Sequence, residues 1–517
     1  MKFLLYFFAL LFCGIHVFGA DYYVGSNSEW YALAQKIDPG DNVLFKAGVY
    51  KDIKLIINAS GTENKRIEIA AKEPGKVFFT GDVKVELRGS FITLNGIVFK
   101  DGNRDTTFWK PHGPGLVAIY GSCNRVTLCA FNNFDEAHSA WVTTSLDENG
   151  KAPVHCRIDH CSFTNKLTFD QVINLNNTPK KDTIGGPPMY HRIDHCFFSN
   201  PKKPGNAGGA IRIGYYRNDL GRCLVDSNVF ERQDSEPEII TGKSQENIYF
   251  ANTFLNCQGT LNFRHGDRQL AFNNFFISTD SLFGYGGMFV WGSRHIIANN
   301  YFSLQKTIAS RGNAAICFNA GTRASEHALA FDCDLVNNVF FKVNGYAIHL
   351  NPLIENRTIF AHQTQQLLEF PQDLRFENNI FYDNLFPSYP FFKDDYPNLN
   401  RSLVWKNNNY FGATTGISLV AGLAKHSISI KQISKDFLLP YINEKTTVSR
   451  QENFEDIPGL KFQIQAIVNT GIVGRPLGMQ DIIPSWMMTN MGTYYQNGKL
   501  EPKLKNQLKR ITENSVQ

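Results

Sequence analysis

The chain lacks three features that would place it in other protein classes. After the first twenty residues, no apolar run is long enough to cross a bilayer, so we expect no membrane span. Ten cysteines scattered over 517 residues are too sparse for a disulfide scaffold, and we expect buried thiols. No helical periodicity is sustained through the middle of the chain, so we expect the central fold to be built of strands.

The N-terminal segment, MKFLLYFFALLFCGIHVFGA (1–20), holds one lysine and then an apolar run that ends in small residues. This is the pattern of a secretory signal peptide, with cleavage near Gly19 or Ala20, and it predicts a secreted or periplasmic protein. The formal net charge is +5 and includes Lys2 of this segment, so the rest of the chain is mildly basic. That balance is compatible with a polyanionic ligand without requiring one. We expect a monomer with no nucleic-acid partner.

A short phrase rich in β-branched and aromatic residues recurs, as in RIDHCSF, RIDHCFF, AFNNFF and RFENNIF. Its copies end at Phe99, Phe163, Phe198, Phe230, Phe254, Phe276, Phe302, Phe340, Phe381 and Phe411. From Phe163 onwards, successive copies lie 22 to 41 residues apart. Constant strand phrases separated by variable loops predict an all-β fold, a parallel β-helix, over residues 21–430. A propeller would need a more even period and about four strands per blade, so it ranks second.

The polar residues of the phrase also belong to the predicted solenoid. We interpret Asn274, Asn300, Asn338 and Asn379 as a stacked hydrogen-bonding ladder rather than ligand groups. The Asp-His-Cys phrases at 159–161 and 194–196 share one phase of the repeat, so they should stack on each other and serve structure. Residues 29–39 predict a short amphipathic helix that caps one end, and residues 431–517 form a C-terminal extension on or beyond the solenoid.

One stretch, SEPEIITGKS, places Glu236, Glu238 and Lys243 in or beside a strand, where unpaired charges are costly. Counted from the aromatic residue of their coils, Asn206, Glu236, Glu238 and Arg264 lie at even offsets, which predicts one polar column on three successive coils. Two carboxylates and an amide form an oxygen ligand set that suits Ca2+. A column of salt bridges, Glu238 to Arg264 and Glu236 to Lys243, is the alternative, and the spacing leaves both open.

A calcium ion at this column would give the site a lyase chemistry. If a uronate carboxylate binds the metal, its C5 proton becomes more acidic. A partly desolvated lysine beside a cation has a lowered pKa, so Lys243 can act as the base, and Arg264 can steady the leaving oxygen. The result is β-elimination. Hydrolysis is less well supported, because both carboxylates lie on one strand rather than flanking a bond.

The runs GNAGGAIRIGYYRND, RQDSEPEIITGKSQEN, GTLNFRHGDRQ and YGGMFVWGSRH resemble polysaccharide lyase family 6, and within it the chondroitinases B that cleave dermatan sulfate. The resemblance implies a right-handed parallel β-helix of the pectate-lyase type and a Ca2+-assisted β-elimination. The calcium ligands that it implies are Asn206, Glu236 and Glu238. It implies Lys243 as the base and Arg264 as the acid. The residues that it implies near the substrate are His112, His265, Trp291, Arg311, Glu326 and Arg357.

The family's pattern has an arginine pair near the sugar sulfate, and here one of the two positions is Asn356, beside Arg357. One of the two arginine contacts that the resemblance implies for a sulfated galactosamine is therefore missing from the sequence. The leading expectation is a lyase for dermatan sulfate. An alginate lyase of the same family and a non-catalytic polysaccharide-binding β-helix are the alternatives. Arg311 and Arg357 favour a sulfated substrate, and the presence of both Lys243 and Arg264 favours an enzyme.

Overall fold

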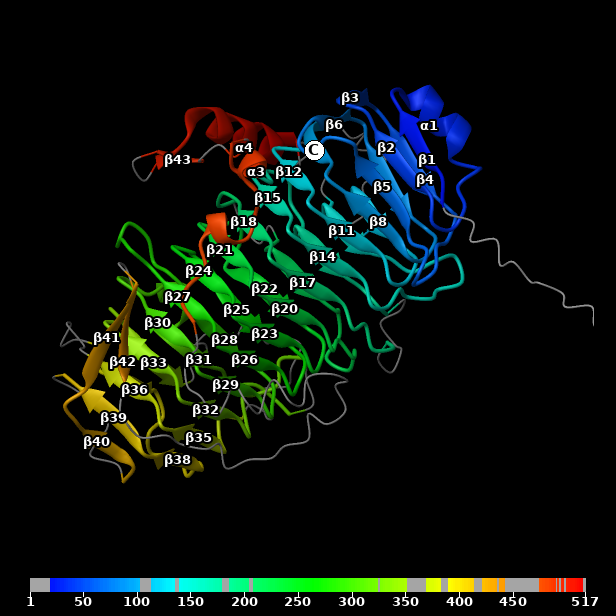
Figure 1. Ribbon diagram of the computed structural model, residues 1–517. Coiled ribbons are helices and arrows are strands. Elements are labelled where there is room, and N and C mark those ends of the chain that lie inside the picture. Colours follow the sequence, from blue (N-terminus) through cyan, green and yellow to red (C-terminus); the bar gives the residue numbers. More distant parts are fainter. Residues whose placement is uncertain are drawn as a thin grey trace, which may run out of the picture.

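The computed structural model describes residues 19–102, 113–134, 139–178, 186–203, 208–323, 326–350, 369–382, 389–412, 421–434, 437–441, 474–489, 491, 494–496 and 499–514. In these residues, three long parallel sheets, named A, B and C, run along the molecule (Figure 1). Through the main body, each turn of the chain adds one strand to A, then one to B, then one to C. The predicted all-β parallel β-helix is therefore confirmed.

Sheet A, in spatial order, consists of β1 (Asp21–Val24), β2 (Asn42–Phe45), β5 (Ile67–Ala71), β8 (Ile92–Asn95), β11 (Arg125–Thr127), β14 (Arg157–Asp159), β17 (Arg192–Asp194), β20 (Leu224–Asp226), β23 (Ile248–Phe250), β26 (Leu270–Phe272), β29 (Ile296–Ala298), β32 (Asp334–Val336), β35 (Leu374–Glu377) and β38 (Leu403–Lys406). Sheet B consists of β3 (Gly48–Lys51), β6 (Val77–Gly81), β9 (Val98–Gly102), β12 (Ala130–Asn132), β15 (Ser162–Thr164), β18 (Phe197–Ser199), β21 (Val229–Glu231), β24 (Thr253–Leu255), β27 (Phe275–Ile277), β30 (Tyr301–Ser303), β33 (Val339–Phe341), β36 (Ile380–Tyr382), β39 (Asn408–Phe411) and β40 (Leu423–Lys425).

Sheet C consists of β4 (Lys54–Ile57), β7 (Lys84–Leu87), β10 (Val117–Ile119), β13 (Val142–Thr144), β16 (Ile173–Leu175), β19 (Ile211–Ile213), β22 (Glu238–Gly242), β25 (Thr260–Phe263), β28 (Met288–Val290), β31 (Ala314–Phe318), β34 (Tyr346–Leu350) and β37 (Phe392–Asp394). Outside these sheets lie α1 (Asn27–Leu33), η2 (Ala309–Arg311), η6 (Met479–Asp481), α3 (Ser485–Met488), α4 (Pro502–Asn514) and the antiparallel pairs β41 (Ser429–Ser434) with β42 (Phe437–Tyr441) and β43 (Tyr495–Gln496) with β44 (Lys499–Leu500).

The recurring phrase makes the corner between sheets A and B. Its first asparagine turns the chain with a left-handed backbone, for example at Asn273 and Asn299 (φ 57° and 56°), a conformation that asparagine tolerates well. The next asparagine points into the interior, and its Nδ2 donates to Oδ1 of the asparagine on the following coil at 2.9–3.0 Å. The predicted amide ladder is confirmed. Its members are Asn228, Asn252, Asn274, Asn300, Asn338, Asn379 and Asn408.

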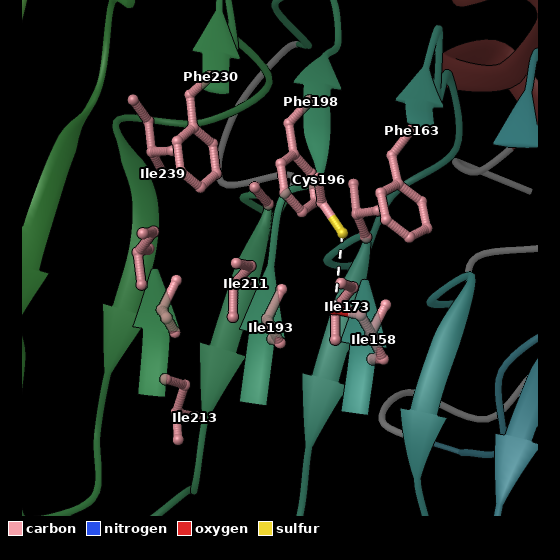
Figure 2. Packing of buried hydrophobic residues seen from close by; sticks show 14 of the residues in the cluster. Ile158, Phe163, Ile173, Ile193, Cys196, Phe198, Ile211, Ile213, Phe230 and Ile239 are labelled. Carbon is pink, nitrogen blue, oxygen red and sulfur yellow. Dashed lines mark hydrogen bonds between the residues drawn. The ribbon is translucent and has the colours of Figure 1, made fainter. Parts of the chain in front are cut away.

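Aromatic and aliphatic side chains fill the interior beside this ladder. The final phenylalanine of each phrase stacks on the next, with ring centroids 4.5–5.0 Å apart from Phe99 to Phe381. Figure 2 shows Phe163, Phe198 and Phe230 in one row, with Ile158 and Ile193 below them. Stacking of like residues on successive coils explains why the phrase recurs with its aromatic position unchanged.

The Asp-His-Cys phrases carry an ion-pair ladder on the outer face of sheet A. Arg125 and Arg157 each bind the buried aspartate of the next coil, Asp159 and Asp194, through two nitrogens at 2.6–2.8 Å. Since burial alone would raise their pKa, the arginines and the neighbouring histidines account for the lowered pKa of both aspartates. The rings of the phrase histidines, at 160 and 195, stack 5.0 Å apart, so the expected stacking is confirmed. All nine described cysteines are free thiols, and eight are buried.

The two ends of the solenoid differ. The helix expected at 29–39 is α1, Asn27–Leu33, which begins earlier because the Ser26 hydroxyl accepts from the Glu29 amide, and which ends sooner. Its Trp30 is buried against Phe45. Figure 1 shows α1 beside β1, at one end of the solenoid. No described helix is long and apolar enough to cross a membrane. Of the predicted signal peptide, residues 1–20, positions 1–18 lie outside the described residues.

C-terminal segments cover the outer face of sheet B (Figure 1). Side chains from η6, α3 and the residues between them pack on the outward residues of β9, β12, β18 and β21, and Phe437 of β42 packs on those of β27, β30 and β33. The outward apolar residues of these strands are thereby removed from water.

Candidate active site

The outer face of sheet C carries the residues of the predicted column. The register of successive strands places Arg212, Thr241, Asn262, Phe289 and Cys317 side by side, one from each coil. The residues before and after them in each strand point into the core. This outward row forms the floor of the candidate site.

A β-bulge in β22 sets the position of Glu238. Glu238 pairs with Thr260 and Ile240 with Leu261, so Ile239 is extra, and both isoleucines lie in the core. The bulge brings Glu238 and Thr241 onto one face despite their odd spacing, and the Thr241 hydroxyl lies 3.3 Å from Oε2 of Glu238.

The register predicted from even offsets is therefore wrong in part. Asn262 lies opposite Thr241 rather than Glu238, because the extra residue shifts the alternation. On the preceding coil, Gly209 lies against Glu238, since a Cβ on this glycine would fall 1.9 Å from the Glu238 carbonyl oxygen. Asn206, which was expected to stack on Glu238, lies outside the described residues.

Glu238 is paired with two arginines. Its Oε1 accepts from Nη1 of Arg264 and lies 3.7 Å from Nη2 of Arg311. Burial favours the neutral carboxyl, but the two arginines outweigh it and lower the pKa of Glu238. Of the two proposed salt bridges of the column, the one from Glu238 to Arg264 is present.

Glu236 is a buried carboxylate with an unused oxygen. It is 8% exposed, and its Oε2 has no hydrogen-bond partner among the described residues. Burial, together with the charge of Glu238, raises the pKa of Glu236 to about 7. The ammonium of Lys203 is also buried and has no hydrogen-bond partner in the described chain, and burial lowers its pKa well below the usual value.

Lys243 follows β22 directly and lies partly buried at the edge of the row. Its Nζ lies 5.0 Å from the centroid of the Tyr215 ring. Burial, and then the charges of Arg212 and Arg264, lower the pKa of Lys243 to about 8. A substantial fraction of this amine is thus unprotonated in mildly alkaline solution, as a general base requires.

The residues expected near the substrate surround Arg264. The guanidinium carbon of Arg264 lies 5.0 Å from the centroid of the Trp291 ring, a cation–π contact. Nδ1 of His265 lies 3.2 Å from Oε2 of Glu326, which also accepts from the Arg217 amide at 2.9 Å. Burial lowers the pKa of His265. The structure thus brings Arg264, His265, Trp291 and Glu326 together, whereas His112 and Arg357 lie outside the described residues.

Sequence reasoning missed Arg212 and Tyr215. Arg212 is only 1% exposed, yet it lies on the outward row beside the catalytic candidates. The triplet IRI of β19 carries the same signal as the glutamates of β22, a charge inside an apolar strand phrase. Tyr215 follows in the next turn, where its position against Lys243 depends on the folded chain.

Several buried hydrogen-bond donors lie around the row without a partner among the described residues. Among the described residues, the donors without a hydrogen-bond partner there include Nδ2 of Asn262, Nε of Arg264, Nε1 of Trp291 and Nε of Arg311. An unpaired buried donor costs about 1–3 kcal/mol, so these donors suit a ligand rich in oxygen acceptors. Carboxylate and sulfate groups meet this requirement.

Comparison with models of known protein families identifies the family of this chain. The profile of the chondroitinase B family matches residues 24–463. The chain belongs to the chondroitinase B family. This confirms the resemblance stated from the sequence and assigns the chain to the polysaccharide lyases. No curated protein sequence matches significantly.

Solved structures similar to this member of the chondroitinase B family include three from polysaccharide lyase family 6. The family 6 alginate lyase AlyGC has 23% identity and a TM-score of 0.69 over 93% of this chain, which spans 59% of AlyGC. A mannuronic acid specific family 6 lyase from human gut microbiota has 22% identity and a TM-score of 0.63, over 79% of this chain and 92% of that one. The family 6 lyase Pedsa3628 from Pseudopedobacter saltans has 20% identity and a TM-score of 0.59, over 75% and 92%. At these identities, the likenesses show the shared fold.

Proposed function

We propose that the protein cleaves dermatan sulfate by β-elimination at the uronate, with Lys243 as base and Arg264 beside the leaving oxygen. The observation that carries this proposal is the position of a partly buried amine with a pKa of about 8 near the charge of Arg264, beside buried donors that have no partner in the described residues. A binding module gains nothing from an unprotonated lysine at this place.

In the proposed reaction, the Lys243 amine removes the proton from C5 of the uronate. The electron pair left on C5 forms the C4–C5 double bond as the bond between C4 and the glycosidic oxygen breaks, and the departing oxygen takes up a proton from water to become a hydroxyl group. Arg264, held against Glu238 and the Trp291 ring, donates hydrogen bonds to the departing oxygen. Because guanidinium stays charged near neutral pH, this stabilisation is present throughout the step.

We include Ca2+ in the proposal, with Asn206, Glu236 and Glu238 as its ligands. In the described residues, no group of three or more His, Cys, Asp or Glu gathers as a metal cluster. The two glutamates nevertheless fit a cation, because a buried carboxylate oxygen of Glu236 lacks a partner and the neighbouring negative charge raises its pKa. When bound, Ca2+ would neutralise the uronate carboxylate and acidify C5–H.

Dermatan sulfate is favoured by the family profile and by the arginines. Arg311 is mostly buried, and its guanidinium carbon lies 4.5 Å from the centroid of the Phe289 ring, with Nε unpaired in the described residues. Such a fixed guanidinium suits a sulfate oxygen. Alginate is the second candidate, because the similar solved structures include alginate lyases. We also propose that the protein acts outside the cytoplasm, as its N-terminal segment suggests.

The test is the ultraviolet absorbance of unsaturated uronates when the purified protein meets dermatan sulfate, chondroitin 4-sulfate and alginate in parallel. We expect product from dermatan sulfate and little from alginate, and we expect chelation to abolish turnover. Added Ca2+ should restore activity while Mg2+ does so poorly, since Mg2+ demands a rigid octahedral shell. Product from alginate alone would reject the substrate, and full activity in excess chelator would reject the metal.

A further inference from the structure

Two cations share one aromatic ring beside the row. The guanidinium carbon of Arg212 lies 5.1 Å from the centroid of the Tyr215 ring, and Nζ of Lys243 lies 5.0 Å from the same centroid. The two charges therefore lie no more than about 10 Å apart, within reach of a strong Coulomb interaction at a partly buried site. Of the two, only lysine can lose its proton near neutral pH.

The backbone fixes this arrangement. Arg212 lies opposite Thr241 on the next strand, two residues before Lys243, and the Lys243 amide donates to the Ile213 carbonyl at 3.0 Å. The turn that holds Tyr215 is anchored by the buried Asp219, whose Oδ2 accepts from the Tyr215 amide at 2.9 Å.

The arginine is held independently of the lysine. Nη2 of Arg212 donates to Oδ1 of Asn176 at 3.2 Å, and the side chain is 1% exposed. A buried, hydrogen-bonded guanidinium cannot swing into solvent to relieve its repulsion with a nearby ammonium. The repulsion instead favours loss of the lysine proton.

We propose that Arg212 and Tyr215 are positioning residues for Lys243: the tyrosine ring holds the amine in place, and the fixed charge of the arginine favours release of its proton. The proposal rests on the assignment of Lys243 as the base. Other charged or titratable groups act on Lys243 in the described residues, and they come from β22, the residues before it and the end of β25: Glu236, Glu238, Arg264 and His265.

The opposing signs of these groups make the effect of Arg212 separable. The two glutamates favour the protonated amine, whereas Arg264 disfavours it. Arg264 is itself ion-paired with Glu238, so its charge is partly compensated. The charges of Asp170, Tyr215 and Glu236 act on Arg212 in turn, so its removal should shift the lysine equilibrium by the part of its charge that these groups leave uncompensated.

The experiment compares the pH dependence of kcat/KM in the parent protein, Arg212→Met and Arg212→Lys. Two unit charges about 10 Å apart, at an effective dielectric constant of about 20, are coupled by roughly one pH unit. In Arg212→Met, the acid limb of the profile should therefore move up by about one unit. This lowers the rate about tenfold on that limb and leaves the alkaline plateau close to that of the parent. Arg212→Lys keeps a positive charge and should keep the position of the limb.

A second measurement needs neither substrate nor metal. The rate at which an acylating reagent modifies Lys243, followed by peptide mass spectrometry across pH, reports the fraction of free amine. Its midpoint should rise by the same amount in Arg212→Met. For the ring, Tyr215→Phe should retain the limb, whereas Tyr215→Leu should lower the plateau of kcat with little change in KM.

Three outcomes would overturn the proposal: an unmoved limb in Arg212→Met, an unmoved labelling midpoint, or a rate loss of equal size at every pH. The Lys243→Ala variant distinguishes failure of the proposed function from failure of the positioning role. If that variant remains active, Lys243 is not the base and both proposals fall. If it is inactive while the limb of Arg212→Met stays in place, only the positioning role fails.

Discussion

Replacing Glu236 by glutamine should stabilise the metal-free protein in alkaline solution. Burial and the charge of Glu238 raise the pKa of Glu236 from 4.5 to about 7. The unfolded chain ionises this carboxyl near 4.5, so the free energy of unfolding falls as pH rises from 4.5 to about 7 and is level above that. A difference of about 2.5 pKa units corresponds to about 3 kcal/mol. Glutamine does not ionise and therefore escapes this loss.

The assay is urea unfolding of both proteins in chelator at pH 4.5 and pH 8.5. The two midpoints should nearly coincide in acid, and the variant should be the more stable at pH 8.5. Glu246→Gln is the matched control, because Glu246 is equally exposed (8%) but is ion-paired with Arg222 and Arg268. These bonds lower its pKa despite burial, so this control should lose stability at pH 8.5. A Glu236 variant no more stable than the parent at pH 8.5 would refute the reasoning.

Three further predictions concern the site and the ladder. Lys243→Ala should lower turnover by about 10²–10⁴-fold while substrate still binds, and Lys243→Arg should not restore it, as measured by uronate absorbance beside a binding assay; near-parental cleavage would contradict the assignment. Arg357→Ala should weaken binding of sulfated polymer by roughly 1.5–3 kcal/mol and of desulfated polymer little, and equal losses would exclude sulfate reading. Asn300→Ala should lower the free energy of unfolding by about 2–4 kcal/mol in urea titrations, because it leaves the buried Asn274 amide, which now donates to Oδ1 of Asn300 at 2.9 Å, without its acceptor. A loss below about 0.5 kcal/mol would mean that the ladder is dispensable at this coil.

The fold was predictable because its main contacts repeat in the sequence. Each asparagine of the ladder bonds to the same residue type on the next coil, so one local phrase specifies both the corner and its partner. The phrase also carries the phenylalanine that stacks in the core. Loop lengths vary without disturbing either contact, so the repeat still predicted the fold although its copies lie at unequal intervals.

The site was predictable in its residue types but not in its register. Glu236, Glu238, Lys243 and Arg264 lie together as expected, whereas the even spacing used to align them fails at the bulge, where Thr241 shares a face with Glu238. A bulge adds one residue without changing the local composition, so it could not be predicted from the alternation of polar and apolar residues. Arg212 was overlooked because its importance comes from a neighbour on another coil.

The C-terminal segments that cover sheet B impose an order on the maturation of the chain. Ile482, Ile483 and Met487 pack on outward residues of sheet B, the last of which in the sequence is Val229. The ribosome synthesises Val229 about 250 residues before it reaches these three. At roughly 5–20 residues per second, this apolar face stays without its cover for about 12–50 s after it leaves the ribosome. A chain that crosses a membrane before it folds would avoid that interval. A chain that stalls or is truncated before residue 482 would instead leave this apolar surface exposed, and it would be prone to aggregate.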